Sequence, residues 1–129
     1  MLKSGKKYDL KLFKVKLEDL YHDVPNYALK WEFKGKKGIY AVDTTTLEGI
    51  EAKGYDLFLV ENNYNEDLIE EHIQEAKENN DENKLYYLER AKQTHLSSQE
   101  CNSFLIENME SNSEYCYIHQ SSYNYREVD

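Results

Sequence analysis

Residues 38–44 read Gly38-Ile39-Tyr40-Ala41-Val42-Asp43-Thr44, an apolar run that ends in an aspartate. Residues 13–17 and 27–34 alternate apolar and polar side chains, which is typical of half-buried strands. Gly35-Lys36-Lys37-Gly38 is a hairpin turn signal ahead of the aspartate run. Residues 57–60, Leu-Phe-Leu-Val, are continuously apolar and predict a strand covered on both faces. The first 60 residues therefore predict a β-sheet.

Helical signals follow this sheet. Asn65 is a favourable N-cap, and the acidic residues behind it suit the positive end of a helix dipole. Ser97 and Glu100 form a capping box ahead of an apolar stripe that reaches Met109. The elements expected after the aspartate are a brief helix within 44–52, helices after Asn65, over 85–92 and after Ser97, and a strand over 115–118.

The length of the chain allows one domain. We expect it to cover residues 1–120, with a flexible tail over 121–129. No apolar stretch approaches the roughly 18 residues of a membrane span, and the N-terminus lacks the apolar core of a signal peptide. A cytoplasmic location is therefore expected. Cys101 and Cys116 are expected to be reduced core residues.

Charge is distributed unevenly. Residues 1–40 carry ten lysines against five acidic residues, whereas residues 41–129 carry six basic residues against twenty acidic ones. The dense acidic part argues against direct binding of nucleic acid, because the phosphate backbone demands the opposite sign. It suits either a surface that binds a basic protein partner or a surface whose charge only keeps the protein in solution.

Three potential metal ligands each adjoin a predicted element. His22 follows the strand over 13–17, Asp43 ends the run quoted above, and His95 precedes the last helix. Imidazole and carboxylate groups are ligands that Zn²⁺ and Mn²⁺ accept. His72 and His119 are too isolated in the sequence to supply a cluster of further ligands. A structural role for the trio, as a vestigial site, is favoured over a working metal site, which is the alternative.

The order of these segments resembles the C-terminal half of the metallo-β-lactamase fold. The resemblance rests on four stretches, which match the family's later metal motifs and the strand after its fourth motif. They are Tyr21-His22-Asp23-Val24-Pro25-Asn26, Gly38 to Thr44, Tyr55 to Tyr64, and Thr94-His95-Leu96-Ser97. The fold class implied is α+β: half of an αββα sandwich, with a mostly antiparallel sheet packed against two to three helices. Hydrolase-like relatives of this kind occur in phages, so the resemblance also suggests a phage or mobile-element origin. The expected location is the host cytoplasm if a phage encodes the chain.

The resemblance implies roles for the trio. His22 would bind a first metal, Asp43 would bridge two metals and His95 would bind the second, with Zn²⁺ or Mn²⁺ activating a water for hydrolysis. The family's His-x-His-x-Asp-His stretch, which supplies further ligands, does not occur in this sequence. Hydrolysis by this chain alone is therefore not expected, and no cofactor is expected unless the half-site is completed. The sheet surface left bare would need a second copy, a separate N-terminal chain or repacked helices to cover it.

Two functions follow from these observations. The first is a non-catalytic acidic protein that inhibits a basic, nucleic-acid-binding host defence protein, in the manner of an anti-CRISPR protein that mimics DNA. An RNA-guided nuclease, with its motif-reading arginines, is such a target. The alternative is the C-terminal half of a split metal-dependent hydrolase that needs a separate N-terminal chain; an inert gene remnant is a third possibility. The carboxylates expected to meet a basic partner are Glu66, Asp67, Glu70, Glu71 and Glu75.

Overall fold

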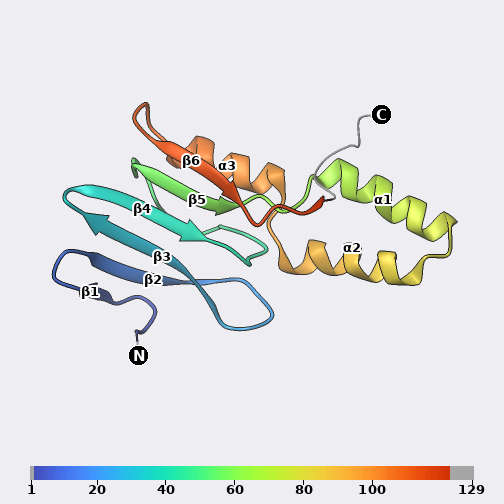
Figure 1. The fold of residues 1–129 in the computed structure, drawn as a ribbon, viewed down its shortest axis with the longest axis horizontal. Helices are drawn as coiled ribbons and strands as arrows, with labels where there is room; N and C mark the ends of the chain where they lie inside the picture. The colour runs from blue at the N-terminus through green and yellow to red at the C-terminus, as the bar shows by residue number, and fades with distance from the viewer. Residues whose placement is uncertain (1, 123–129) are drawn as a thin grey trace.

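The computed structural model describes residues 2–122 and shows one six-stranded sheet with three helices (Figure 1). The strands lie in the order in which they occur in the chain. They are β1 (Lys7–Asp9), β2 (Lys14–Leu20), β3 (Asn26–Phe33), β4 (Lys36–Ala41), β5 (Leu57–Glu61) and β6 (Glu114–Ile118). The helices are α1 (Glu66–Glu78), α2 (Glu82–Thr94) and α3 (Ser98–Asn108). The predicted α+β class is confirmed.

Strand direction changes once across the sheet. The pairs β1–β2, β2–β3 and β3–β4 are antiparallel, and the pairs β4–β5 and β5–β6 are parallel. The tight turn between β3 and β4 uses Lys34 and Gly35, both with positive φ (48° and 76°), as a two-residue hairpin of the primed type requires. Because β2, β4, β5 and β6 run in one direction, their carboxyl ends meet at a single edge of the sheet.

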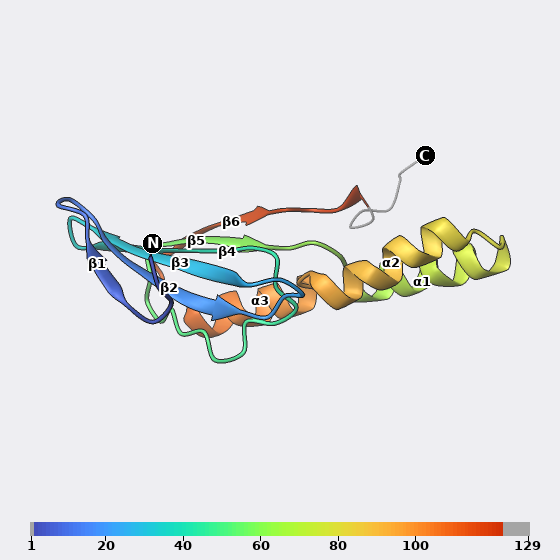
Figure 2. The same ribbon diagram turned by 90° about the horizontal axis from the view of Figure 1, so that it is seen from below.

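Within residues 2–122, only one face of the sheet carries a helix. Helix α3 and the loop between β4 and β5 lie against that face, and the opposite face is bare (Figure 2). The core between them contains Ile39, Ala41, Phe58 and Val60 from the strands, and Phe104 from α3. The prediction that residues 57–60 are covered on both faces is therefore wrong. Leu57 and Leu59 point away from Phe58 by strand alternation and are only half-buried.

Helices α1 and α2 form a hairpin that projects beyond the sheet (Figures 1 and 2). The Asn65 side chain accepts hydrogen bonds from the backbone of Asp67 and Leu68, which confirms the predicted N-cap of α1. The two helices share a small apolar cluster of their own, apart from the sheet core. It consists of Tyr64, Ile69, Ile73, Ala76 and Leu88.

The brief helix predicted within 44–52 is absent, and this segment is an irregular loop. The Thr44 hydroxyl donates to the Thr46 carbonyl, and the Thr46 hydroxyl accepts from the Glu48 amide. These local bonds occupy backbone groups that a helix would use. Gly49 has φ 82°, which a helix does not allow. The other predicted helices and the last strand form, and the Ser97 hydroxyl caps α3 by accepting from the Glu100 amide.

The predicted tail over 121–129 lies outside the described residues from position 123 onward. Within the described part of the chain, no helix is both long and apolar enough to cross a membrane.

Candidate metal site

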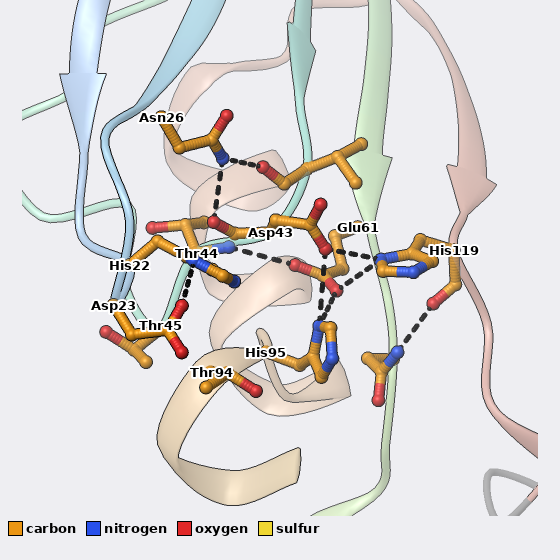
Figure 3. A network of polar contacts seen from close by, with 12 residues as sticks. His22, Asp23, Asn26, Asp43, Thr44, Thr45, Glu61, Thr94, His95 and His119 are labelled. Atoms are coloured by element: carbon orange, nitrogen blue, oxygen red, sulfur yellow. Dashed lines mark hydrogen bonds and ion pairs between the residues drawn. The ribbon is translucent and has the colours of Figure 1, made fainter. Parts of the chain in front are cut away.

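Four metal-ligating side chains meet at the edge where the like-directed strands end. Asp43 follows β4, Glu61 ends β5, His119 follows β6, and His95 links α2 to α3. One potential ligand atom from each lies within 4.8 Å of the others. Figure 3 shows both imidazoles directed toward the Glu61 carboxylate, with Asp43 beside it. The parallel arrangement of β4, β5 and β6 thus gathers residues that lie far apart in the sequence.

The potential ligand atoms are closely spaced. The Nδ1 atoms of His95 and His119 lie 2.7 and 2.8 Å from Oε1 of Glu61. The same two nitrogens lie 3.6 and 3.1 Å from Oδ1 of Asp43. A tetrahedral zinc ion with bonds of about 2.0–2.1 Å separates its ligand atoms by about 3.3 Å. The four contacts, at 2.7–3.6 Å, lie on either side of this separation. Imidazole and carboxylate are groups that Zn²⁺ accepts, and Mn²⁺ accepts the same groups.

Glu61 is the least accessible member of the site, with 0% of its surface exposed. A buried carboxylate is costly unless it is hydrogen-bonded or neutralised. Besides the two imidazoles, Glu61 accepts a hydrogen bond of 3.2 Å from the Thr44 amide. The hydrogen bond to Glu61 raises the pKa of His95 above its ordinary value against the effect of burial. The cluster therefore favours positive charge around the Glu61 carboxylate, supplied by protonated imidazole or by a cation.

Two of the four residues adopt an unusual backbone. Asp43 and His119 have φ of 57° and 54°, in the left-handed region that residues other than glycine rarely occupy. The Asn26 side chain holds the first loop by donating to the carbonyls of Val42 and Asp43, at 2.5 and 2.8 Å. The Asn63 side chain holds the second by donating to the His119 carbonyl at 2.8 Å. Strained positions fixed in this way are found mainly at functional sites.

His22, the third member of the predicted trio, lies at the flank of the cluster. Its ring centroid is 6.5 Å from that of His95, and it does not belong to the group of four. Its Nδ1 lies 2.5 Å from the carboxylate of Asp23, which also accepts from Arg90 of α2 at 2.6 Å. Asp43 and His95 lie in the same cluster, as the sequence indicated. His22 instead contacts Asp23 at the flank of that cluster.

Sequence reasoning missed Glu61 and His119. His119 is isolated in the sequence, but β6 lies beside β5 and brings its imidazole to Glu61. Both residues carry the signal that singled out Asp43, a ligand at the end of a strand. Only the strand order, which is a property of the folded chain, shows that these ends coincide.

The predicted partner-binding carboxylates lie within α1 and do not belong to the metal cluster. Glu70 pairs with Lys92, Glu75 with Lys84 and His72, and Glu66 accepts from the Ser97 hydroxyl at 2.6 Å. These contacts tie α1 to α2 and to the start of α3. Asp67 and Glu71 complete the exposed acidic face.

No known protein family and no curated protein matches the sequence. Among solved structures, the fold is similar to that of the metallo-β-lactamase fold protein YhfI from Bacillus subtilis, at 15% identity and a TM-score of 0.68. The match covers 93% of this chain and 42% of YhfI, so the chain spans less than half the length of that protein. The described residues thus form a half-fold of the metallo-β-lactamase type, with four metal-ligating side chains at one edge of its sheet.

Proposed function

We propose that this chain binds one divalent metal ion through Asp43, Glu61, His95 and His119, and that it supplies the C-terminal half of a metal-dependent hydrolase centre. The observation that carries the proposal is the spacing of the four ligand atoms, all within 4.8 Å of one another. When bound, a Zn²⁺ or Mn²⁺ ion supplies Lewis-acid chemistry and a water of lowered pKa. The residues of this chain hold that ion at the edge of the sheet.

The bare face of the sheet supports the proposal that this chain is one half of a hydrolase. Leu57 and Leu59 of β5 and Tyr40 of β4 share this face, and Tyr40 is 42% exposed. An apolar face that borders a metal cluster suits a second sheet packed against it. The occupant we propose is a polypeptide that bears a His-x-His-x-Asp-His stretch, as a partner chain or as further sequence. It would bring the remaining ligands to the same edge.

Metal titration tests the proposed metal site directly. We expect the chelator-treated protein to bind one equivalent of Zn²⁺ or Mn²⁺ in calorimetry, and elemental analysis to find the metal in protein purified without chelator. Glu61→Gln and His119→Ala should each weaken this binding strongly, whereas His72→Ala, a change to a histidine on α1, should leave it intact. Absence of stoichiometric binding in the wild-type chain would refute the metal site.

The proposal of a split hydrolase has its own test. A chain with the His-x-His-x-Asp-His stretch should co-purify with this protein, and the mixture should show metal-dependent esterase or nuclease activity. If the chain binds metal but the mixture shows no such activity, the proposed metal site stands and the proposal of a split hydrolase is refuted.

A second candidate function rests on the shape of the α1–α2 hairpin. The hairpin projects from the sheet (Figure 2). The predicted partner-binding carboxylates of α1 are exposed to solvent. We propose as this alternative that the face binds a basic, nucleic-acid-binding protein, such as a phage-targeted RNA-guided nuclease, in place of DNA. Salt should weaken such binding strongly. Asp67→Asn with Glu71→Gln should reduce it further, and competition with DNA that is unchanged at high salt would contradict it.

A further inference from the structure

The end of the sheet opposite the metal cluster carries a basic pocket. It has a volume of about 380 Å³ and lies on the side of the sheet that bears α3 and the β4–β5 loop. Five lysines line it, together with Glu32, Trp31 and Tyr55. The lysines are Lys7, Lys14, Lys16, Lys30 and Lys37. This concentration of positive charge stands out in a chain whose net charge is −9.

The strand register places lysines directly opposite one another. Lys7 of β1 faces Lys16 of β2, and Lys16 faces Lys30 of β3. Like charges in such cross-strand pairs destabilise a sheet. Glu18 relieves part of this repulsion, because its carboxylate lies 2.5 Å from the ammonium of Lys16 and 2.7 Å from that of Lys30. A single carboxylate between two ammonium groups leaves the row with a net positive charge.

Three of the pocket lysines are not neutralised by a salt bridge within the described residues. Lys7, Lys14 and Lys37 form no salt bridge with any residue in the described range 2–122. In the next row of the sheet, Glu32 of β3 lies opposite both Lys14 and Lys37 in register. One acidic residue for two lysines again leaves an excess of positive charge, which an anion would neutralise.

Tyr55 adds an aromatic wall to the pocket. The ammonium groups of Lys30 and Lys37 each lie 5.9 Å from the centre of its ring. Lys30 is held in place, because it is 93% buried and also donates to the Glu51 carbonyl. A fixed ring bordered by ammonium groups offers a stacking surface next to a binding point for phosphate.

We propose that this pocket binds the phosphate groups of a nucleotide, with its base or ribose against Tyr55. The volume falls within the range of small-molecule sites, and lysine is a frequent ligand of phosphate. The same chemistry is offered by a free nucleotide and by a nucleotide within a single strand of nucleic acid. The acidic α1–α2 hairpin, which repels such ligands, projects from the opposite end of the sheet (Figure 1).

This site is separate from the metal cluster. Lys37 lies near the start of β4 and Asp43 just beyond its end, six positions later, which spans about 20 Å at 3.3 Å per residue. Nucleotide binding can therefore be measured in the presence of a chelator. Its failure would leave the proposed metal site untouched, and loss of the metal site would leave nucleotide binding unchanged.

Calorimetry provides the readout, because the ring of Trp31 lies over Gly38 on the opposite, bare face of the sheet. In EDTA and low salt, we expect ATP to bind saturably at one site. The variant Lys14→Gln/Lys37→Gln should weaken this binding about tenfold or more, as the loss of two ammonium–phosphate contacts implies. The variant Lys3→Gln/Lys77→Gln makes the same change in net charge outside the pocket and should bind as the wild type does.

Two further probes identify the ligand. An oligothymidylate that binds more tightly than ATP would assign the pocket to single-stranded nucleic acid, and the reverse order would assign it to free nucleotides. Inorganic pyrophosphate that binds as tightly as ATP would overturn the role of Tyr55 and the nucleotide assignment. Equal weakening in the pocket variant and its matched control, or no binding of ATP or the oligonucleotide, would overturn the proposal.

Discussion

The imidazole of His119 lies 2.8 Å from the carboxylate of Glu61, although 58 positions separate the two residues. This contact exists because β6 runs parallel to β5 and pairs Ile118 with Glu61. The same Glu61 oxygen also meets the Nδ1 of His95 at 2.7 Å. Glu61 is thus the common partner of two imidazoles that reach it from different elements.

The first prediction separates the four clustered residues from the trio that the sequence indicated. His119→Ala should weaken Zn²⁺ binding about 100-fold, equivalent to about 2.7 kcal/mol, because it removes one of four ligands. His22→Ala should change the affinity less than threefold, since His22 is paired with Asp23 outside the group. Competition with a chromogenic chelator measures both. A larger loss in His22→Ala than in His119→Ala would show that the ligand set is wrong.

The second prediction concerns the left-handed backbone of Asp43, at φ 57°. Asp43→Gly and Asp43→Ala both remove the carboxylate and should both abolish metal binding. The glycine variant should be more stable than the alanine variant by about 1 kcal/mol, because only glycine occupies this region without steric cost. Urea denaturation of the metal-free proteins measures the difference. Equal stabilities would show that this loop relaxes to an ordinary conformation.

Local signals in the sequence were enough to predict several elements. The side chains of Asn65 and Ser97 cap the helices that follow them within three residues, so neighbouring positions contain the information. The strand alternation over 27–34 likewise corresponds to β3. The failure at 44–52 is also local in origin, because the hydrogen bonds of Thr44 and Thr46 depend on side-chain rotamers that a hydrophobic pattern does not reveal.

The composition of the site could be predicted only in part. Asp43 and His95 were recognised as ligands at the ends of apolar segments, but the grouping with Glu61 and His119 depends on the parallel order β4-β5-β6. Nothing in the local pattern of residues 114–119 fixes the neighbour of that strand. The position of His22 likewise depends on Arg90, which is 67 residues from Asp23 and draws that carboxylate toward α2.

The third prediction concerns Glu18, the carboxylate between Lys16 and Lys30. Burial opposes its charged form, but hydrogen bonds from both lysines outweigh that effect and hold the pKa of Glu18 below its ordinary value. Glu18→Gln should lower the free energy of unfolding at pH 7 by about 2 kcal/mol, because it leaves the buried ammonium of Lys30 without its carboxylate.

The dependence of this effect on pH follows from its sign. A carboxyl group whose pKa is lowered in the folded state contributes stability above its unfolded pKa of about 4.3 and loses that contribution as the pH falls through the folded value. The stability difference between wild type and Glu18→Gln should therefore be constant from pH 7 to about pH 5 and shrink in more acidic solution. Urea denaturation across this range measures it, and a difference that grows on acidification would contradict the assignment.

The fourth prediction uses the two free cysteines as reporters of the two faces of the sheet. Cys101 of α3 is buried in the core, and burial raises the pKa of its thiol to about 12, with a further contribution from Glu61. Cys116 of β6 is exposed, which corrects the expectation that both are core residues. By strand alternation from Tyr117, which packs against the core, the Cys116 thiol lies on the bare face.

At pH 8 a thiol reagent should therefore modify one cysteine per folded chain rapidly, and Cys116→Ser should remove that reaction. Unfolding in urea should expose Cys101 and restore one reactive thiol in that variant. Addition of a polypeptide that covers the bare face should slow the reaction of Cys116, whereas a partner that binds only the acidic face of α1 should leave its rate unchanged.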